Sequence, residues 1–185
     1  MRRQTNRNAG KHVVNATGSP IAERIRRLFG GEPLRMQVAA LPWRKTSDGV
    51  DVMLITSRET GRWVLPKGWP ERDEAPCQAA AREAAEEAGL AGSVSSASAG
   101  HYVYVKVDRI GGDDVGCEVW VYPLEVDQLA SKWKEQKLRT RKWFAAAEAV
   151  DLVDEPDLKV LIADFCANPR RSLLPAPPSA GSPQR

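Results

Sequence analysis

Three glutamates on one face of a predicted helix constrain this chain more than any other feature. Glu83, Glu86 and Glu87 are spaced three and four residues apart, so in a helix they share a face and repel one another. Gly89 favours the end of that helix, which puts the carboxylates near the negative pole of the helix dipole. Each effect disfavours the helix by about a few tenths of a kcal/mol. A divalent cation with oxygen ligands would turn this repulsion into binding.

The acidic cluster closes a longer pattern of fixed spacing. Its seven fixed positions are Gly68, Glu74, Arg82, Glu83, Glu86, Glu87 and Gly89. With base rates of roughly 5–7 % per residue type, a chance match at one starting point is on the order of 10⁻⁸ to 10⁻⁹. The pattern resembles the Nudix box, the signature of the Nudix hydrolase family, with Ala84 and Leu90 at its two loosely apolar positions. The alternative is a solvated helix face with an Arg82–Glu86 ion pair.

Prolines separate a loop from the helix in this region. Pro70 and Pro76 bracket a segment that cannot be helical, so residues 68–74 are predicted to form a loop. Pro76 suits the first helical turn, and Gly89 ends a helix predicted over residues 76–88. The small residues at 77–81 predict close packing of this helix on a sheet.

The resemblance implies a role for each box residue. It makes Glu83, Glu86 and Glu87, with the Gly68 carbonyl, the ligands of Mg²⁺, for which Mn²⁺ can substitute. Glu86 is also the expected proton acceptor. Glu74 and Arg82 are expected to form a pair that orients the loop. The predicted catalytic residues are therefore Glu74, Arg82, Glu83 and Glu86.

Segments outside the box resemble the diphosphoinositol and diadenosine polyphosphate phosphohydrolase branch of the family. They are residues 56–58, 62–68 and 139–144. This resemblance implies hydrolysis of a phosphoanhydride in a nucleoside diphosphate-linked or polyphosphate compound. Lys67 and Trp69 stand where animal members of the branch usually have glycines.

Five side chains are candidates for substrate binding. The cations are expected to clamp phosphate, and the aromatic ring to hold a planar group. For each cation the alternative is an ordinary surface side chain, and Trp63 is expected to pack in the core. The candidates are Arg58, Lys67, Trp69, Arg139 and Arg141. Glu118, on a predicted strand, is a further candidate acidic ligand.

Other functions remain open at this stage. The substrate could instead be ADP-ribose or a nucleotide sugar, and some Nudix folds are ligand sensors without hydrolysis. All box glutamates are present, which favours an enzyme. Hydrolysis of an RNA cap is a third hypothesis, against which the acidic domain argues, because a nucleic-acid groove should be basic. The expected partner is a small molecule, and a homodimer is left open.

The remaining pattern predicts an α/β (α+β) domain of the Nudix fold, a mixed sheet between helices. Apolar and β-branched runs predict the strands, and Pro156 opens a last helix. A hairpin loop is predicted at residues 111–114. The predicted strands are 34–43, 50–57, 63–65, 93–97, 101–107, 118–125 and 140–144, and the further helices are 21–29 and 157–166.

Charge and composition divide the chain. Residues 1–33 carry seven basic and two acidic side chains, residues 34–168 carry seventeen and twenty-two, and residues 169–185 carry three and none. We predict a disordered basic tail at 1–19, a helical lead-in at 20–33, the Nudix domain at 34–168 and a disordered Pro/Ser-rich tail at 169–185. Three widely spaced cysteines and the lack of long apolar runs predict a cytoplasmic protein without membrane spans.

Overall fold

The structure is a computed structural model that describes residues 20–28, 30–31, 33–107 and 113–169. The tail predicted at 1–19 and nearly all of that predicted at 169–185 lie outside these residues. Among the described residues, no helix is long and apolar enough to cross a membrane.

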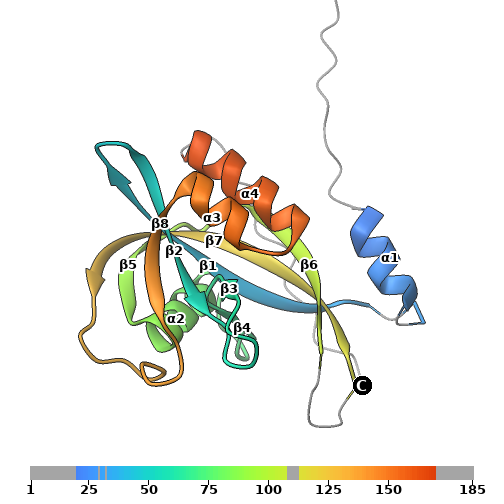
Figure 1. Ribbon diagram of the computed structural model, residues 1–185. Coiled ribbons are helices and arrows are strands. Elements are labelled where there is room, and N and C mark those ends of the chain that lie inside the picture. The colour runs from blue at the N-terminus through green and yellow to red at the C-terminus, as the bar shows by residue number, and fades with distance from the viewer. Residues whose placement is uncertain (1–19, 29, 32, 108–112, 170–185) are drawn as a thin grey trace, which may run out of the picture.

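One mixed sheet forms the centre of the molecule (Figure 1). Its main order is β3-β2-β1-β7-β5, while β4 pairs with β1, β6 with β7 and β8 with β2. The central strands β1 and β7 are parallel, and the other pairs are antiparallel. The strands are β1 (Arg35–Thr46), β2 (Gly49–Thr56), β3 (Trp63–Val64), β4 (Lys67–Gly68), β5 (Leu90–Val94), β6 (Gly100–Lys106), β7 (Val115–Leu129) and β8 (Arg141–Ala145).

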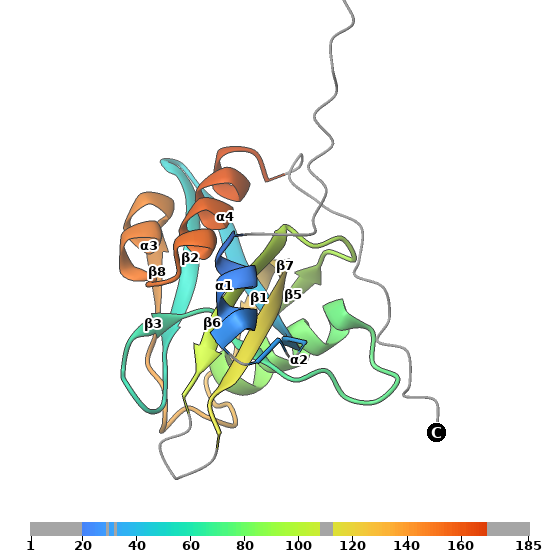
Figure 2. The ribbon, with the colours of Figure 1, turned by 90° about the vertical axis from the view of Figure 1, so that its right-hand side faces the viewer.

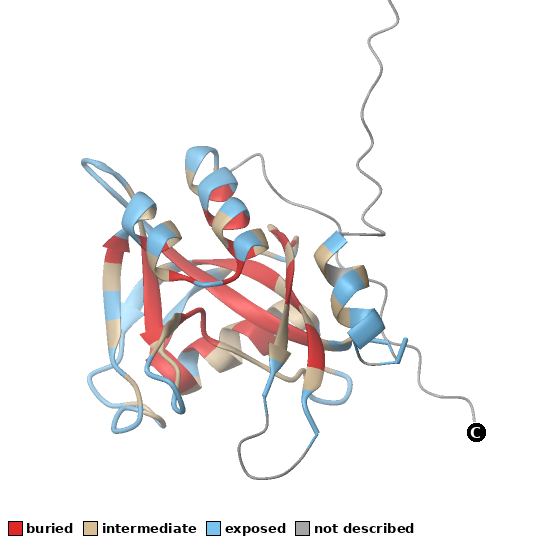
Figure 3. Ribbon diagram, turned by 45° about the vertical axis from the view of Figure 1, so that its right-hand side comes forward, coloured by how far each residue is buried: buried red, intermediate tan, exposed pale blue. Residues whose placement is uncertain are grey.

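Helices cover both faces of this sheet, as predicted. The helices are α1 (Pro20–Leu28), α2 (Pro76–Ala88), α3 (Ala146–Leu152) and α4 (Pro156–Ala167). Helix α2 lies on one face, α3 and α4 lie on the other, and α1 sits beside β6 and β7 (Figure 2). Alternate residues of β1 therefore enter different cores: Val38 and Ala40 pack with α2, while Ala39 and Leu41 pack with α4. Burial is concentrated along the central strands and the inner helix faces (Figure 3).

Helix α2 has the predicted bounds. Pro76 stands in its first turn, and Gly89 ends it in the left-handed conformation with φ of 63°. The Gly89 N–H bonds to the carbonyls of the preceding turn. Ala79, Ala80, Ala84 and Ala88 are buried against the sheet, so the box helix lies close to the strands.

Several element boundaries differ from the prediction. The strand expected at 93–97 is wrong in position, because the chain passes from the Gly89 turn directly into β5 at Leu90, and Ser95 forms a side-chain turn with Ala97. Strand β7 is longer than expected because β1, β5 and β6 all pair along it. The sequence patterns missed β4 and α3, which span two and seven residues and are too short to show a period.

We expect Gly89→Ala to destabilise the protein more than Gly61→Ala does. Both glycines have positive φ, 63° and 69°, so alanine costs about 1–2 kcal/mol at either position. At Gly89 the added Cβ would also lie 2.9 Å from atoms of Trp133 and Arg141, whereas at Gly61 it meets nothing within 4 Å. The overlap should add about 1–3 kcal/mol to the loss, measured by urea unfolding. Equal losses of unfolding free energy in the two variants would show that Trp133 and Arg141 do not pack tightly around Gly89.

Candidate active site

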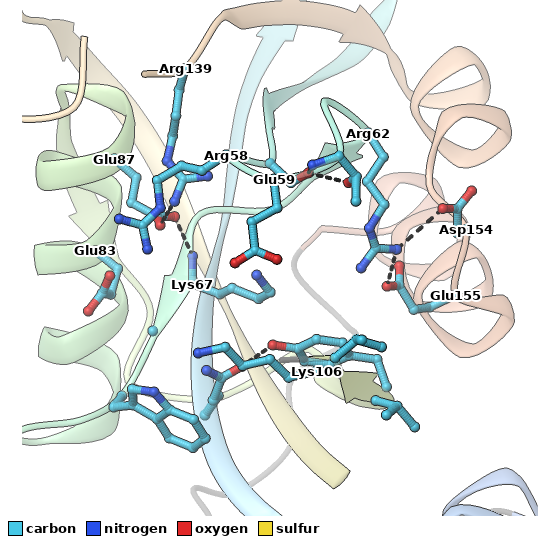
Figure 4. A pocket seen from close by; sticks show the side chains of 18 of the residues that line it. Arg58, Glu59, Arg62, Lys67, Glu83, Glu87, Lys106, Arg139, Asp154 and Glu155 are labelled. Atoms are coloured by element: carbon cyan, nitrogen blue, oxygen red, sulfur yellow. Dashed lines mark hydrogen bonds and ion pairs between the residues drawn. The ribbon is translucent and has the colours of Figure 1, made fainter. Parts of the chain in front are cut away.

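A pocket of about 760 Å³ opens beside the box helix. It is walled by α2, by β4, by β6, by the loop of residues 57–62 that follows β2, and by the turn that leads into α4. Glu83 and Glu87 line its α2 side, and Arg62, Asp154 and Glu155 line the opposite side (Figure 4). Elements far apart in the sequence therefore meet around one cavity.

Gly68 lies directly against the Glu83 side chain. Strand β4 pairs with β1 through Val38 and Gly68, and this pairing holds the glycine under α2. A Cβ at Gly68 would overlap with the Glu83 carboxylate. A larger residue here would displace the Glu83 carboxylate, which gives the first fixed position of the box a steric reason.

Arg82 fastens the loop to α2. Its Nε donates to Glu74 Oε1 at 3.0 Å, and its Nη2 donates to Glu74 Oε2 at 3.1 Å and to the Trp69 carbonyl at 3.0 Å. Its Nη1 donates to Glu83 Oε1 at 2.8 Å. These bonds hold the pKa of Glu74 below its usual value. The expected Glu74–Arg82 contact is thus present, in place of the Arg82–Glu86 pair that a plain solvated helix would favour.

The other two box carboxylates are held by cations from the segment between β7 and β8. Lys134 Nζ donates to Glu86 at 2.6 Å. The Arg139 guanidinium donates to Glu87, and also to Glu135 at 2.6 Å. The second Glu87 oxygen accepts the Lys67 backbone N–H at 3.0 Å. Each box glutamate therefore has a protein cation as its counter-ion.

The same segment and the first residue of β8, together residues 130–141, donate hydrogen bonds to the backbone carbonyls at the end of α2. Such carbonyls lack partners within the helix and need donors from elsewhere. The bonds run from Glu135 N–H to Glu86 O at 3.1 Å, from Trp133 Nε1 to Glu87 O at 3.2 Å, from Arg141 Nη1 to Ala88 O, and from Ala130 N–H to Gly89 O at 2.8 Å. The segment therefore fixes both the backbone and the side chains of this helix end.

The residues at the end of α2 fit a hard divalent cation. Carboxylate oxygens are the ligands that Mg²⁺ prefers, and burial raises the pKa of Glu83 and Glu87, so that a nearby positive charge would stabilise their ionised forms. Within the described part of the chain, no three His, Cys, Asp or Glu side chains are grouped as ligands of one ion. The protein cations bonded to Glu83, Glu86 and Glu87 hold these carboxylates apart.

Comparison with protein families settles the relationship. A family model described as the NUDIX domain matches residues 33–165. The chain belongs to the Nudix family. The matched region contains the whole box and every element from β1 to the last turn of α4.

Named relatives come from plants and animals. Nudix hydrolase 16, mitochondrial, of Arabidopsis thaliana is 35% identical over 121 residues, which cover 63% of this chain and 66% of the relative. Human diphosphoinositol polyphosphate phosphohydrolase 3-alpha is 28% identical over 134 residues, which cover 69% and 74%. The chain spans about half to two thirds of the length of the first Arabidopsis relatives. Several of these carry mitochondrial or chloroplastic in their names, so the cytoplasmic location stays a prediction.

Solved structures agree with the fold. A NUDIX hydrolase from Nitrosomonas europaea has a TM-score of 0.57 at 20% identity and covers 81% of this chain and 100% of that one. The C. elegans Ap4A hydrolase binary complex has a TM-score of 0.51 at 22% identity, covering 72% and 96%. The NUDIX domain of Shewanella oneidensis NrtR complexed with ADP ribose has a TM-score of 0.54 at 16% identity, covering 72% and 88%.

Four of the five predicted substrate-binding side chains line the pocket next to the Nudix box. They are Arg58, Lys67, Trp69 and Arg139. Arg58 is largely exposed and lies 3.5 Å from Glu135. Arg139 is buried, and its guanidinium also donates to the Thr56 carbonyl at 3.0 Å. Burial lowers the pKa of the Lys67 ammonium. Arg35 lies 4.4 Å from the centre of the Trp69 ring.

Two sequence-based assignments differ from the structure. Arg141 does not line the pocket: it donates to the carbonyls at the end of α2, and its guanidinium lies 3.9 Å from the Trp133 ring centre. Arg141 is the first residue of β8, whereas Arg139 lies before that strand, so the two side chains reach different parts of the molecule. Glu118 also lies outside the pocket lining, and pairs with His101 at 3.5 Å. Trp63 packs against Phe144 with ring centres 4.9 Å apart, as expected for a core residue.

Sequence reasoning missed several pocket residues. Three of them lie on strands β1 and β6, and the others come from loops and turns. Arg62 lies in the resembling segment 62–68, and Glu155 precedes the helix-starting Pro156, but neither signal indicates a pocket residue. The missed residues are Gln37, Glu59, Arg62, Tyr104, Lys106, Glu135, Asp154 and Glu155.

We expect Lys134→Gln to tighten binding of a divalent cation. The Lys134 ammonium competes for Glu86, and an exposed ion pair is weak, so the Kd for Mn²⁺ should fall by a factor of at most about five. Lys132→Gln is the matched control, because it removes the same charge from the same segment and the structure shows no ion pair for Lys132 among the described residues. The Kd of each variant is measured by titration with Mn²⁺, with free Mn²⁺ detected by electron paramagnetic resonance. Equal or weaker binding in Lys134→Gln than in the control would contradict the competition.

Proposed function

We propose that this chain is a Mg²⁺-dependent hydrolase that cleaves a phosphoanhydride bond in a small molecule. The observation that supports this best is the position of Glu83 and Glu87, which are at least half-buried and open on a pocket that basic side chains also line. Such a pocket suits a cation and a phosphate chain side by side. Retention of every box glutamate favours catalysis over a purely ligand-sensing role.

The proposed division of labour follows from the contacts. Glu83, Glu86 and Glu87, with the Gly68 carbonyl, would hold the cation, which when bound neutralises phosphate charge and activates water. Glu86 is the proposed proton acceptor, because it is the most exposed of the three carboxylates and its counter-ion, Lys134, is a flexible surface side chain. Arg82 keeps Glu74 and the loop of residues 68–74 in place.

The proposed substrate carries more than two phosphates, as a dinucleoside polyphosphate does. The cation neutralises only the phosphates nearest the scissile bond, so the remaining charge needs separate clamps. Arg58 and Lys67 line the pocket close to the box carboxylates and are the proposed clamps, with Arg139 as a third once it leaves Glu87. The name of the C. elegans neighbour, an Ap4A hydrolase, agrees with this class.

A smaller substrate is the second candidate. The NrtR neighbour was solved with ADP ribose, and the pocket volume does not separate a diphosphate-linked compound from a longer one. ADP-ribose or a nucleotide sugar would use the same cation with fewer clamps.

Glu86→Gln is expected to lower turnover by at least about a hundredfold while the fold stays intact. Glu86 is partly exposed, and among the described residues its ion pair is with the surface side chain of Lys134, so the free energy of unfolding should change little. Phosphate release with Mg²⁺, together with urea unfolding, measures both quantities. Full activity of the wild type in excess chelator would refute the metal-dependent proposal.

Arg58→Ala should separate the two substrate classes. Loss of a charge-assisted contact costs about 1.5–3 kcal/mol, so kcat/KM on diadenosine tetraphosphate should fall roughly ten- to a hundredfold. The loss on ADP-ribose should be much smaller. Arg24→Ala, on the exposed face of α1, is the control. Equal losses on both substrates would move ADP-ribose or a nucleotide sugar to first place.

A further inference from the structure

A second cavity lies at the opposite end of α4 from the pocket beside the box helix. Its volume is about 620 Å³, and it is enclosed by the hairpin of β1 and β2, by α3 and by the last turns of α4 (Figure 1). Among the described residues, none lines both cavities. The proposed hydrolase function therefore makes no use of this second cavity, which we call the hairpin groove.

Small apolar side chains form much of the hairpin groove. Val50 comes from the hairpin, Ala146 and Val150 come from α3, and Cys166 comes from α4. Each of these four residues is only partly covered by the described chain. Because burial of apolar area is favourable, this surface suits an apolar occupant.

The hairpin groove also carries negative charge. Asp48, Asp51 and Asp151 line it, and no basic residue of the described chain does. Asp51 pairs with Arg44 at 2.8 Å, whereas the described residues form no ion pair with Asp48 or Asp151. Lys159 reaches only the backbone carbonyl of Asp151, at 3.4 Å. An occupant with basic as well as apolar side chains would therefore match the groove best.

The chain that follows α4 has this composition. Residues 170–175 read Arg-Arg-Ser-Leu-Leu-Pro, and residues 170–185 contain no acidic side chain. Leu173 and Leu174 are the only large apolar side chains in residues 170–185. Pro175 disfavours a helical conformation at Leu174, so the sequence favours an extended segment, which suits a groove.

The connection to the hairpin groove is short. Ala167 is the last residue of α4 and lines the groove, and Pro169 is the last residue that the structure describes. Asn168 has φ of −154° and ψ of 74°, so the helix does not continue through it. Four extended residues span at most about 13–14 Å, so Leu173 lies within that distance of Pro169. This short tether gives the segment a high effective concentration at the groove.

We infer that residues 170–175 bind in the hairpin groove of the same molecule. Leu173 and Leu174 cover its small apolar side chains, Cys166 included, and the two arginines before them lie beside Asp48 and Asp151. This inference departs from the disorder that composition predicts for residues 169–185, and limits that disorder to the residues after the bound segment. It does not depend on the proposed function.

The rate at which N-ethylmaleimide alkylates Cys166 in the full chain reports whether the groove is covered. Peptide mass spectrometry measures the rate at each cysteine. Leu173→Asp with Leu174→Asp should release the segment and raise the Cys166 rate at least about tenfold, because a covered thiol reacts only after local opening. Ser179→Asp with Ala180→Asp is the control, since it adds the same charge to the same tail beyond the segment, and it should keep the wild-type rate.

A second pair of variants tests the charges. Asp151→Asn should raise the Cys166 rate by up to about fivefold, because an exposed ion pair is weak. Glu148→Gln removes one charge from the exposed side of α3 outside the groove lining, so it should have no effect. Equal rates in Asp151→Asn and Glu148→Gln would overturn the placement of the arginines.

Two results would overturn the inference as a whole. One is a Cys166 rate in the leucine variant equal to that of the wild type. The other is protection of Cys166 that disappears when the wild type is diluted, because a segment of the same molecule protects at any protein concentration and a second copy does not. Cys77, on α2, reacts in the same samples, and a constant Cys77 rate shows that the domain stays folded.

Discussion

Negative charge at the end of α2 is the constraint on which the site depends. Glu83, Glu86 and Glu87 meet there with the carbonyls of the last helical turn, at the pole of the dipole that already repels anions. Residues 130–141 stabilise this helix end in two ways. Their backbone and side-chain donors bond to its carbonyls, and Lys134 and Arg139 pair with two of its three carboxylates. The protein's own cations therefore offset part of the repulsion at this helix end.

Local features of the site followed from the sequence, and distant ones did not. The bounds of α2, the turn at Gly89 and the Glu74–Arg82 contact depend on residues within one short stretch, where spacing and turn chemistry decide the structure. The cations that pair with Glu86 and Glu87 lie about fifty residues away, and the resemblance indicated Arg139 as a phosphate clamp rather than as the partner of Glu87. No local pattern could identify them.

Arg139 and Arg141 illustrate the same limit at two positions close together in the sequence. Both were predicted to clamp phosphate, since both are basic and lie in one resembling segment. In the structure only Arg139 lines the pocket, while Arg141 caps α2 and stacks on Trp133. Which of two arginines faces a cavity depends on where β8 begins and on what α2 presents to it, and composition does not contain that information. Glu59, Asp154 and Glu155 were missed for a similar reason, because these carboxylates come together at the pocket only in the folded chain.

Competition between protein cations and a metal ion for the box carboxylates is the central claim, and it is tested most directly by anomalous diffraction from crystals of the protein soaked in Mn²⁺. Manganese peaks should lie about 2.0–2.6 Å from oxygens of Glu83, Glu86 and Glu87, with Lys134 and Arg139 withdrawn from their carboxylates. Manganese bound elsewhere, or a site at which both ion pairs persist unchanged, would contradict the account.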